Sequence, residues 1–179
     1  MLQITIPNTE IYDERTNRLI EIKGRDIQLD HSLVSLSKWE SKWKKPFLGT
    51  VEKTWAETID YIRCMTITQN VDPTIYQCLT AENINQVKEY IEDSMTATTF
   101  KKTVRKSQNT VITSEIIYYW MIELEIPVEF QKWHLNRLLT LIRVCDEKSQ
   151  PGKKMSKRDV MSQYRSLNAA RRGRLGTRG

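Results

Sequence analysis

Large apolar side chains recur at spacings of three and four residues through most of this chain. In the stretch HSLVSLSKWESKW, Leu33, Leu36, Trp39 and Trp43 follow one another at intervals of three, three and four. A helix turns once in about 3.6 residues, so this spacing places them on one helix face. Pro46 is expected to end the helix, because the residue before a proline avoids helical backbone angles. The repeated Ser-Lys-Trp is therefore interpreted as a packed helix. Exposed indoles that stack on nucleic-acid bases are the alternative.

Two further helices are indicated in the middle of the chain. Thr54 and Glu57 fit a capping box, and three apolar residues follow at helical spacing: Trp55, Ile59 and Ile62. Thr80 is the expected cap of the next helix, whose apolar face carries Ile84, Val87 and Ile91. Periodicity fades over residues 94–112, which we expect to form a long loop. Its bases are candidate partner contacts or solvated charges: Lys101, Lys102, Arg105 and Lys106.

The segment 114–147 is the most apolar part of the chain. A helix starting at Thr113 or Ser114 presents a wide apolar stripe, which must be buried or must face a partner: Ile116, Ile117, Trp120, Met121 and Leu124. After Pro127, VEFQKW is expected to form a turn. HLNRLLTLIRVC then carries its leucines on one face of a second helix. We predict a helical hairpin with a proline-containing connection.

The first 30 residues alternate between apolar and polar with a period of two, which is typical of strands. Leu2, Ile4 and Ile6 indicate one strand, and EIYDERTNRLIEI indicates a hairpin with its turn at 13–17. Ile27 and Leu29 indicate a further short strand. The predicted fold class is α+β, mainly α, with a small antiparallel sheet in residues 1–30 followed by a helical domain in 31–147.

Charge is distributed unevenly along the chain. Residues 148–179 hold ten Lys and Arg and one acid, Asp159, whereas the preceding 147 residues hold 18 bases and 21 acids. We predict a basic C-terminal arm with an amphipathic helix at about 157–171, on which Val160, Tyr164 and Leu167 are spaced by four and three. Such a short isolated helix is marginal in water, so we expect a partner to order it. The residues after 171 contain three glycines and are expected to be disordered.

Motifs of catalysis and cofactor binding were not found. The chain lacks the glycine-rich phosphate loops, the zinc-protease motif and the nucleophile elbow. His31 and His134 stand far apart, and neither has a second metal ligand at suitable spacing on its own element. Glu123 and Glu125 point to different helix faces, so they cannot converge as an acid–base pair. We therefore expect no catalytic residues, no metal and no cofactor, and a protein that is not an enzyme.

Three cysteines at long spacings, in or beside apolar stretches, indicate reduced thiols in a cytoplasm: Cys64, Cys78 and Cys145. The start MLQITIPNTE lacks the pattern of a secretory signal, and no apolar run reaches the roughly 18 residues that a membrane helix needs. We expect no membrane association.

Four stretches together resemble a family of small proteins from tailed bacteriophages: HSLVSLSKWESKWKKPFL, TIDYIRCMTITQNVDP, IIYYWMIELEIPVEFQKWHLNRLLTLIRVC and MSKRDVMSQYRSLNAARR. The chain resembles, over nearly its whole length, the siphophage tail assembly chaperones encoded between the major tail protein and the tape measure protein. The resemblance implies a helical, non-enzymatic protein of the bacterial host cytoplasm. It would coat the tape measure protein, recruit major tail protein subunits and leave before the virion is complete.

Partner-binding residues are hypothesised in two places. The 114–147 hairpin supplies Trp120, Met121, Phe130 and Trp133, and the arm supplies Lys153, Lys154, Lys157, Arg158, Arg171 and Arg172. Two other functions stay open. One is a structural component of the virion, at the head–tail joint or in the tail, which the strand-like first 30 residues favour. The other is a nucleic-acid-binding accessory protein that uses the arm, although an acidic body would repel DNA.

Overall fold

The computed structural model describes residues 1–13, 17–49, 52–100, 111–149 and 157–176. The chain divides into two compact units, Met1–Arg143 and Val144–Gly179. The fold class is α+β, mainly α, as predicted. Three predicted features lie outside the described residues: the bases of the 94–112 loop, and Lys153 and Lys154 of the arm.

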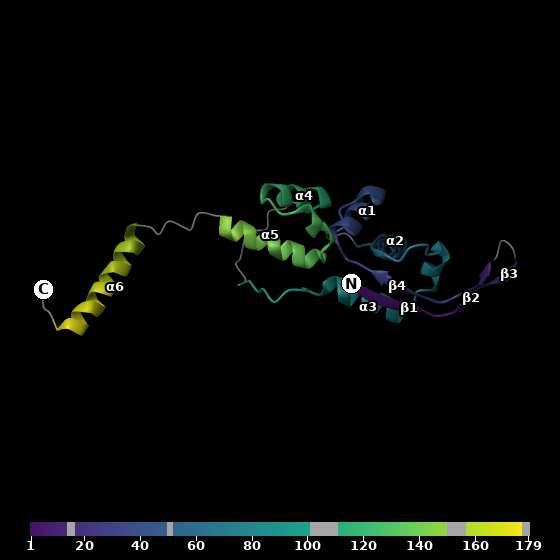
Figure 1. The fold of residues 1–179 in the computed structure, drawn as a ribbon, viewed down its shortest axis with the longest axis horizontal. Coiled ribbons are helices and arrows are strands. Elements are labelled where there is room, and N and C mark those ends of the chain that lie inside the picture. The colour runs from purple at the N-terminus through teal and green to yellow at the C-terminus, as the bar shows by residue number, and fades with distance from the viewer. Residues whose placement is uncertain (14–16, 50–51, 101–110, 150–156, 177–179) are drawn as a thin grey trace. The chain divides into compact units, whose positions relative to one another are not determined.

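The first unit begins with paired antiparallel strands (Figure 1). The strands are β1 (Leu2–Ile6), β2 (Thr9–Asp13), β3 (Arg18–Ile22) and β4 (Arg25–Leu29). β1 pairs with β4, and β2 with β3. Ile6 of β1 lies opposite Arg25 of β4. Thr9, three residues after Ile6, lies opposite Ile22, three residues before Arg25, so the two strand pairs share one register. The predicted hairpin is confirmed as β2 and β3, and the additional strand pairs with β1 instead of joining that hairpin.

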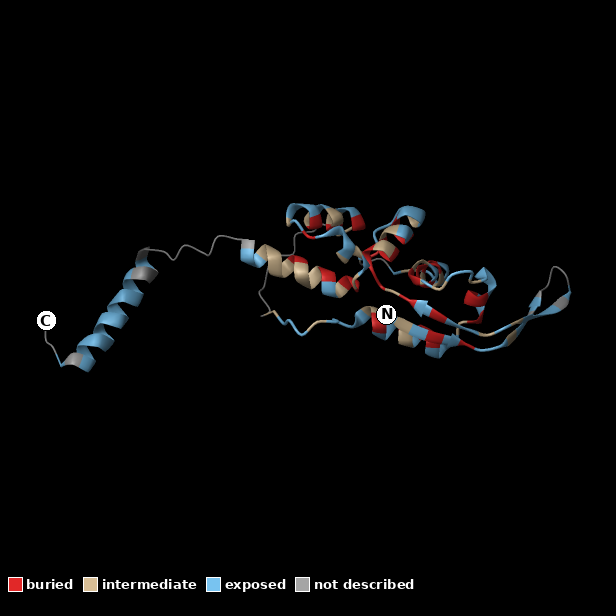
Figure 2. Cartoon of the chain, in the orientation of Figure 1, coloured by how far each residue is buried: buried red, intermediate tan, exposed pale blue. Residues whose placement is uncertain are grey.

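The two strand pairs differ in burial. Ile4, Ile6, Ile27 and Leu29 of β1 and β4 are at most 1% exposed, which matches the alternation of the sequence. On β2 and β3, by contrast, three apolar side chains are exposed: Tyr12, Leu19 and Ile20. Figure 2 shows this change from buried to exposed positions along the ribbon. Among the strand side chains whose burial the structure describes, the buried ones therefore belong to β1 and β4.

The helices after the strands confirm three predicted boundaries, an end before Pro46 and starts at Thr54 and Thr80. The helices are α1 (Leu33–Trp43), α2 (Trp55–Met65), α3 (Ala81–Glu92), α4 (Ser114–Glu123) and α5 (Leu135–Ser149), with 3-10 turns η1 (Pro73–Cys78) and η2 (Val128–Lys132). Capping boxes start α1, α2 and α3 at Ser32, Thr54 and Thr80. Lys44 adopts a left-handed conformation that ends α1 just before Pro46. Each cap satisfies backbone donors that have no partner inside the helix.

Helix α1 lies at the centre of the first unit. Leu33 and Leu36 are fully buried, and α2, α4 and η2 pack against α1, while α3 packs along β1. The predicted 114–147 hairpin is therefore corrected, since α4 has α1 as its main neighbour rather than α5. A carboxylate explains the difference, because Glu40 of α1 accepts the backbone N–H of Ser114 at the start of α4.

The orientation of α2 also differs from the prediction. Trp55 was expected on the packed face with Ile59 and Ile62, yet its side chain is 64% exposed. The buried face of α2 instead includes Glu57 and Asp60. These two carboxylates bind side chains of α1 and of the residues just after it, so they lie on the face of α2 that packs against α1, and Trp55 lies outside that face.

The second unit contains helix α6 (Lys157–Leu175). The predicted helix ended at about 171, with disorder beyond it. Helix α6 continues to Leu175, so the prediction is wrong for residues 172–175, whereas residues 177–179 lie outside the described residues. A single glycine inside a helix costs only about 1 kcal/mol, so Gly173 between strong helix formers does not end α6. The end comes at Gly176, which has a left-handed φ of 65° and a backbone N–H bonded to the carbonyl of Arg172.

Candidate partner-binding surfaces

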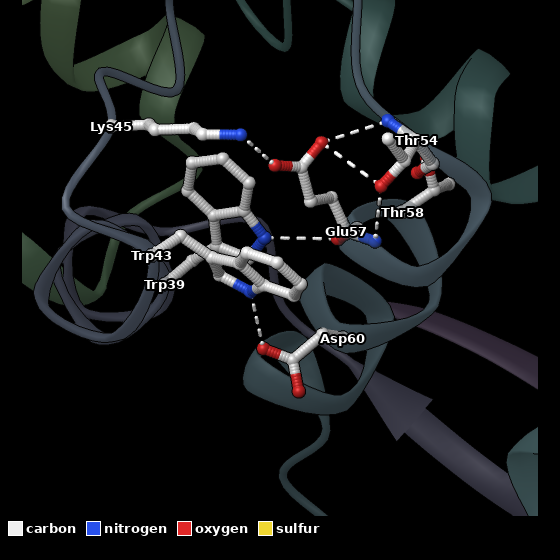
Figure 3. Close-up of polar contacts among 7 residues, drawn as sticks. All are labelled: Trp39, Trp43, Lys45, Thr54, Glu57, Thr58 and Asp60. Atoms are coloured by element: carbon white, nitrogen blue, oxygen red, sulfur yellow. Dashed lines mark hydrogen bonds and ion pairs between the residues drawn. The ribbon is translucent and has the colours of Figure 1, made fainter.

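A polar cluster joins α1 and α2 around the two tryptophans of the repeated motif (Figure 3). The indole Nε1 of Trp39 donates to the backbone carbonyl of Glu57 at 2.9 Å. The indole Nε1 of Trp43 donates to Asp60 Oδ2 at 2.8 Å. Trp39 is 1% exposed and Trp43 is half-buried, with the two rings stacked. The packed-helix interpretation of this motif is therefore confirmed.

The carboxylates of this cluster are occupied by donors of the protein itself. Glu57 Oε1 accepts from Lys45 Nζ at 2.6 Å, and Oε2 accepts the backbone N–H of Thr54 at 2.8 Å. Lys42 pairs with the remaining oxygen of Asp60. The Lys45 hydrogen bond, followed by that of Thr54, lowers the pKa of Glu57 to about 2. Glu57 is thus a structural carboxylate and has no proton to donate at neutral pH.

The structure separates the predicted contact residues of the 114–133 region. Met121 is only 3% exposed, and with Ile117 it forms the face of α4 that packs inward, so it is corrected to a core residue. Trp120, Phe130 and Trp133 are half-buried. The structure brings Phe130 and Trp133 together as stacked rings with centroids 4.1 Å apart.

Exposed apolar side chains on α4 were not singled out from the sequence. Tyr119 is 59% exposed and Ile122 is 78% exposed. With Glu115 they are spaced by four and three, so they share one face of the helix, which we call the α4 outer face. Because α4 is apolar on every side, periodicity could not show which side was buried. Glu115 was the available signal, since an exposed acid on a helix indicates the solvent face.

Helix α6 presents both apolar and basic side chains to solvent. Met161, Tyr164 and Leu167 are 63%, 63% and 47% exposed. Three exposed arginines recur every seven residues and therefore lie along one side of the helix: Arg158, Arg165 and Arg172. Arg171 is exposed as well, and Lys157 is the first residue of α6. The predicted arm residues that the structure describes all belong to α6: Lys157, Arg158, Arg171 and Arg172.

The two histidines, distant in sequence, are neighbours in the fold. Their ring centroids lie 5.0 Å apart. His31 Nδ1 lies 2.6 Å from the Tyr61 hydroxyl, and His134 Nε2 lies 2.9 Å from the Tyr90 carbonyl oxygen. Burial lowers the pKa of both, that of His31 to about 3. Within the described residues there is no cluster of three or more His, Cys, Asp or Glu side chains suited to a metal ion.

The chain matches no protein-family model, and no curated protein and no solved structure is detectably similar to it. Across the described ranges, none of the helices combines the length and the apolar character needed to cross a membrane.

Proposed function

We propose that this chain is a non-enzymatic tail assembly chaperone that holds amphipathic helices of a tape measure protein during assembly. The supporting observation is the exposure of apolar side chains at helical spacing on two helices. Tyr119 and Ile122 form the α4 outer face, and Tyr164 and Leu167 lie exposed on α6. Apolar residues grouped on an exposed helix face are typical of protein-binding surfaces.

The α4 outer face suits an amphipathic helix with basic flanks. Ile122 and Tyr119 offer apolar area, and the exposed acids Glu115 and Glu123 lie on or beside them. A partner helix that buries its apolar stripe here would place Lys or Arg next to these carboxylates. Charge complementarity of this kind sets orientation and partner choice more than it sets affinity.

Helix α6 suits a second partner of the opposite charge. Its exposed arginines flank Tyr164 and Leu167, so an acidic surface with an apolar centre would complement it. A major tail protein subunit is the partner that the family resemblance implies.

Co-expression with a tape measure protein of a tailed bacteriophage tests the proposal. The wild-type chain should keep that protein soluble and co-purify with it. Tyr119→Ser/Ile122→Ser should abolish co-purification, and Tyr164→Ser/Leu167→Ser should abolish capture of the tail tube subunit. Tyr12→Ser/Leu19→Ser, on the equally exposed β2–β3 pair, is the matched control and should behave as wild type. Unchanged complexes with both surface variants would refute the proposal.

A structural virion component is the second candidate. It is favoured by the β2–β3 pair. Its outer edges pair with no other strand in the described part of the chain, and its Tyr12, Leu19 and Ile20 are exposed. Unpaired strand edges are ready to pair with another chain. Mass spectrometry of purified particles separates the two functions, because a chaperone should be absent or present in traces, whereas a component should be stoichiometric.

A nucleic-acid-binding protein is the third candidate, supported by the row of exposed arginines on α6. Binding through phosphates would weaken as salt increases, with a log–log slope that reflects the number of phosphates contacted. A titration of duplex DNA against salt tests this candidate, and the absence of binding at low salt would exclude it.

A further inference from the structure

A small apolar cavity of about 130 Å³ lies in the first unit between α2 and α3. Two residues of the segment that joins α1 to α2, Phe47 and Lys53, also line it. Its wall is formed by buried side chains: Phe47, Tyr61, Ile62, Ile84 and Val87. The cavity involves neither the α4 outer face nor α6, so it is independent of the proposed chaperone surfaces.

The cavity is open to solvent on one side. The other side chains of its lining are half-buried or exposed, and we call them the cavity mouth: Lys53, Thr58, Lys88 and Ile91. On α3, Ile84, Lys88 and Ile91 are spaced by four and three, so one helix face leads from the mouth to the buried wall. Phe47 is 8% exposed and Ile84 is 7% exposed. A ligand can therefore reach the wall through the mouth.

The hydroxyl groups that line the cavity are bonded inside the protein. The Tyr61 hydroxyl lies 2.6 Å from His31 Nδ1, and the Thr58 hydroxyl donates to the backbone carbonyl of Thr54 at 3.1 Å. A polar group placed against the wall would therefore lose its hydrogen bonds to water without replacement. The wall thus selects an apolar group. An apolar cavity of about 150 Å³ can take up benzene, so the volume here suits a group the size of one phenyl ring.

A half-buried cation lies at the cavity mouth. Lys53 Nζ lies 4.3 Å from the centroid of the Phe47 ring, and Tyr61 stacks on that ring with centroids 3.8 Å apart. Within the part of the chain that the structure describes, Lys53 forms no ion pair, and Glu57 is paired with Lys45 instead. Burial lowers the pKa of Lys53 more than the nearby Glu57 raises it. An anion at the mouth would therefore stabilise the charged ammonium.

We propose that this cavity binds a small monocarboxylate by its apolar end, a phenyl or branched alkyl group that one or two carbon atoms join to the carboxylate. The apolar end packs among Ile62, Ile84 and Val87. The carboxylate stays at the mouth and pairs with Lys53, and Lys88 contributes a second positive charge there. Phenylacetate is the simplest aromatic acid of this kind.

Other classes of ligand would use only part of the lining. A neutral hydrocarbon would cover the wall but leave Lys53 without an anion. An inorganic anion would pair with Lys53 but leave the wall uncovered. Sugars and nucleotides carry hydroxyl groups that the wall cannot bond, and a long acyl chain exceeds a volume of about 130 Å³. A small carboxylate with one apolar group satisfies both the wall and the mouth.

Four probes test the proposal by calorimetry on the full chain. Phenylacetate has both features, phenylacetamide lacks the charge, 4-hydroxyphenylacetate carries a hydroxyl at the buried end, and 2-naphthylacetate is too large for the cavity. We expect phenylacetate to bind at least about tenfold more tightly than each of the others. An exposed apolar patch would instead bind the naphthyl group most tightly, because that group has the largest apolar area.

Three outcomes would overturn the proposal: tightest binding of 2-naphthylacetate, equal affinities for the four probes, and no saturable binding of phenylacetate up to about 10 mM. Methyl NMR then locates the ligand. The methyl signals of Ile84 and Val87 should shift on saturation with phenylacetate, whereas those of Ile117, buried on α4, should not. Shifts that spare Ile84 and Val87 would also overturn the proposal.

Two variants test the roles of individual side chains. Lys53→Met keeps the apolar part of the side chain and removes its charge, so it should weaken phenylacetate about tenfold and leave phenylacetamide unchanged. Lys38→Met, exposed on α1 outside the cavity lining, is the matched control and should change neither. Val87→Phe fills the cavity and should abolish binding of phenylacetate. Unaltered phenylacetate binding by Lys53→Met, or by Val87→Phe shown to be folded by circular dichroism, would refute the proposal.

A peptide distinguishes the two sources of this chemistry. A short peptide that ends in phenylalanine with a free carboxylate is compared with phenylacetate. Tighter binding of the peptide assigns the cavity to a protein C-terminus, whereas tighter binding of phenylacetate assigns it to a free small acid. Binding of neither would overturn the proposal. Should Val87→Phe fail to fold, Lys53→Met and the four probes on the wild-type chain still decide the proposal.

Discussion

Glu40, in the last turn of α1, caps α4, which begins 74 residues later in the chain: its Oε2 accepts the backbone N–H of Ser114 at 2.7 Å. Its second oxygen, Oε1, accepts the backbone N–H of Phe47 at 2.8 Å. The carboxylate is 6% exposed, and Thr113, the residue before α4, makes no side-chain cap of its own. A single buried side chain therefore holds both the loop after α1 and the start of α4.

Replacing Glu40 by alanine is expected to destabilise the fold strongly. The substitution leaves two buried N–H groups without an acceptor, which costs on the order of 3 kcal/mol. Glu40→Gln keeps one carbonyl acceptor and should cost about half as much. Urea unfolding followed by circular dichroism measures both. Glu89→Ala, exposed on α3, is the control and should lie within about 0.5 kcal/mol of wild type. A Glu40→Ala chain as stable as this control would contradict the capping role.

The end of α1 and the starts of α2 and α3 were predictable because their signals are local. The capping boxes at Thr54 and Thr80 involve residues three apart, and Pro46 acts on the residue before it. The period-two alternation of Ile4, Ile6 and their neighbours likewise depends only on adjacent positions. Such signals specify where a helix or strand begins and which residues share a face.

Packing partners were not predictable, because they depend on contacts between residues far apart in the chain. Trp55 was assigned to a packed face by its apolar spacing, but it is exposed. The buried face of α2 includes Glu57 and Asp60, which pair with Lys45 and Lys42. Periodicity assigns burial by apolarity and takes no account of ion pairs between elements. An amphipathic helix with buried carboxylates is the case in which this rule fails.

The candidate sites were recoverable only in part for the same reason. The basic and apolar character of α6 is local and was predicted, including Arg158 and Arg172. Met121, however, was predicted to be a contact residue, because apolar side chains occur on most sides of α4. The side of α4 that is buried depends on its packing against α1. The contact of His31 with His134 joins residues over one hundred positions apart, and no sequence pattern reports it.

Stability is expected to decrease as the pH falls below about 6.5. Burial, followed by the neighbouring His134, lowers the pKa of His31 to about 3 in the folded chain, against 6.5 as its ordinary value. The unfolded chain therefore takes up a proton first, and it is favoured increasingly between pH 6.5 and about 3. The effect should be on the order of a few kcal/mol. Thermal unfolding at a series of pH values measures it.

The variant His31→Asn separates this effect from other acid-induced changes. The asparagine Oδ1 can replace Nδ1 as the acceptor of the Tyr61 hydroxyl, whose pKa burial raises, but it does not titrate. Between pH 6.5 and 4.5 the free energy of unfolding of this variant should decrease less steeply as the pH falls. The decrease that remains is expected from His134. The titratable groups around His31 and His134 are Asp30, Tyr61 and Tyr90. Asp93 and the N-terminal amine also lie near His134. An unchanged slope in His31→Asn would contradict the prediction.

Below pH 4.5 a second loss of stability is expected from Glu57. Its folded pKa of about 2 lies below the ordinary 4.5, so its contribution is complete above pH 4.5 and disappears as the pH falls toward 2. Lys45→Met removes the main cause of that shift and should reduce the pH dependence in this range alone.

Fluorescence quenching should distinguish the tryptophans of the repeated motif from Trp55. Trp39 is 1% exposed and Trp55 is 64% exposed. Replacing Trp55 by Phe should lower the acrylamide quenching constant and shift the emission to shorter wavelength. Replacing Trp39 by Phe should raise the average quenching and cost about 1–2 kcal/mol, because Glu57 loses an indole donor. Stronger quenching of Trp39 than of Trp55 would show that the packed-helix interpretation is wrong.

Two glycine-to-alanine substitutions are expected to act in opposite directions. At Gly24, between β3 and β4, an added Cβ would lie 2.4 Å from the backbone oxygen of Ile6 and 2.6 Å from the backbone nitrogen of Asn8. Backbone atoms cannot rotate away as a side chain can, so the strands must separate, at a cost of roughly 1–3 kcal/mol. Urea unfolding should therefore show Gly24→Ala to be destabilised.

At Gly173, inside α6, an added Cβ meets nothing within 4 Å. Alanine has the higher helix propensity by about 1 kcal/mol, so Gly173→Ala should strengthen α6. The expected result is a larger helical signal at 222 nm with the urea midpoint of the first unit unchanged. Since the same chemical change is made in both variants, opposite outcomes depend only on the space around each glycine. A helical signal that falls in Gly173→Ala would contradict the assignment of this position to the interior of α6.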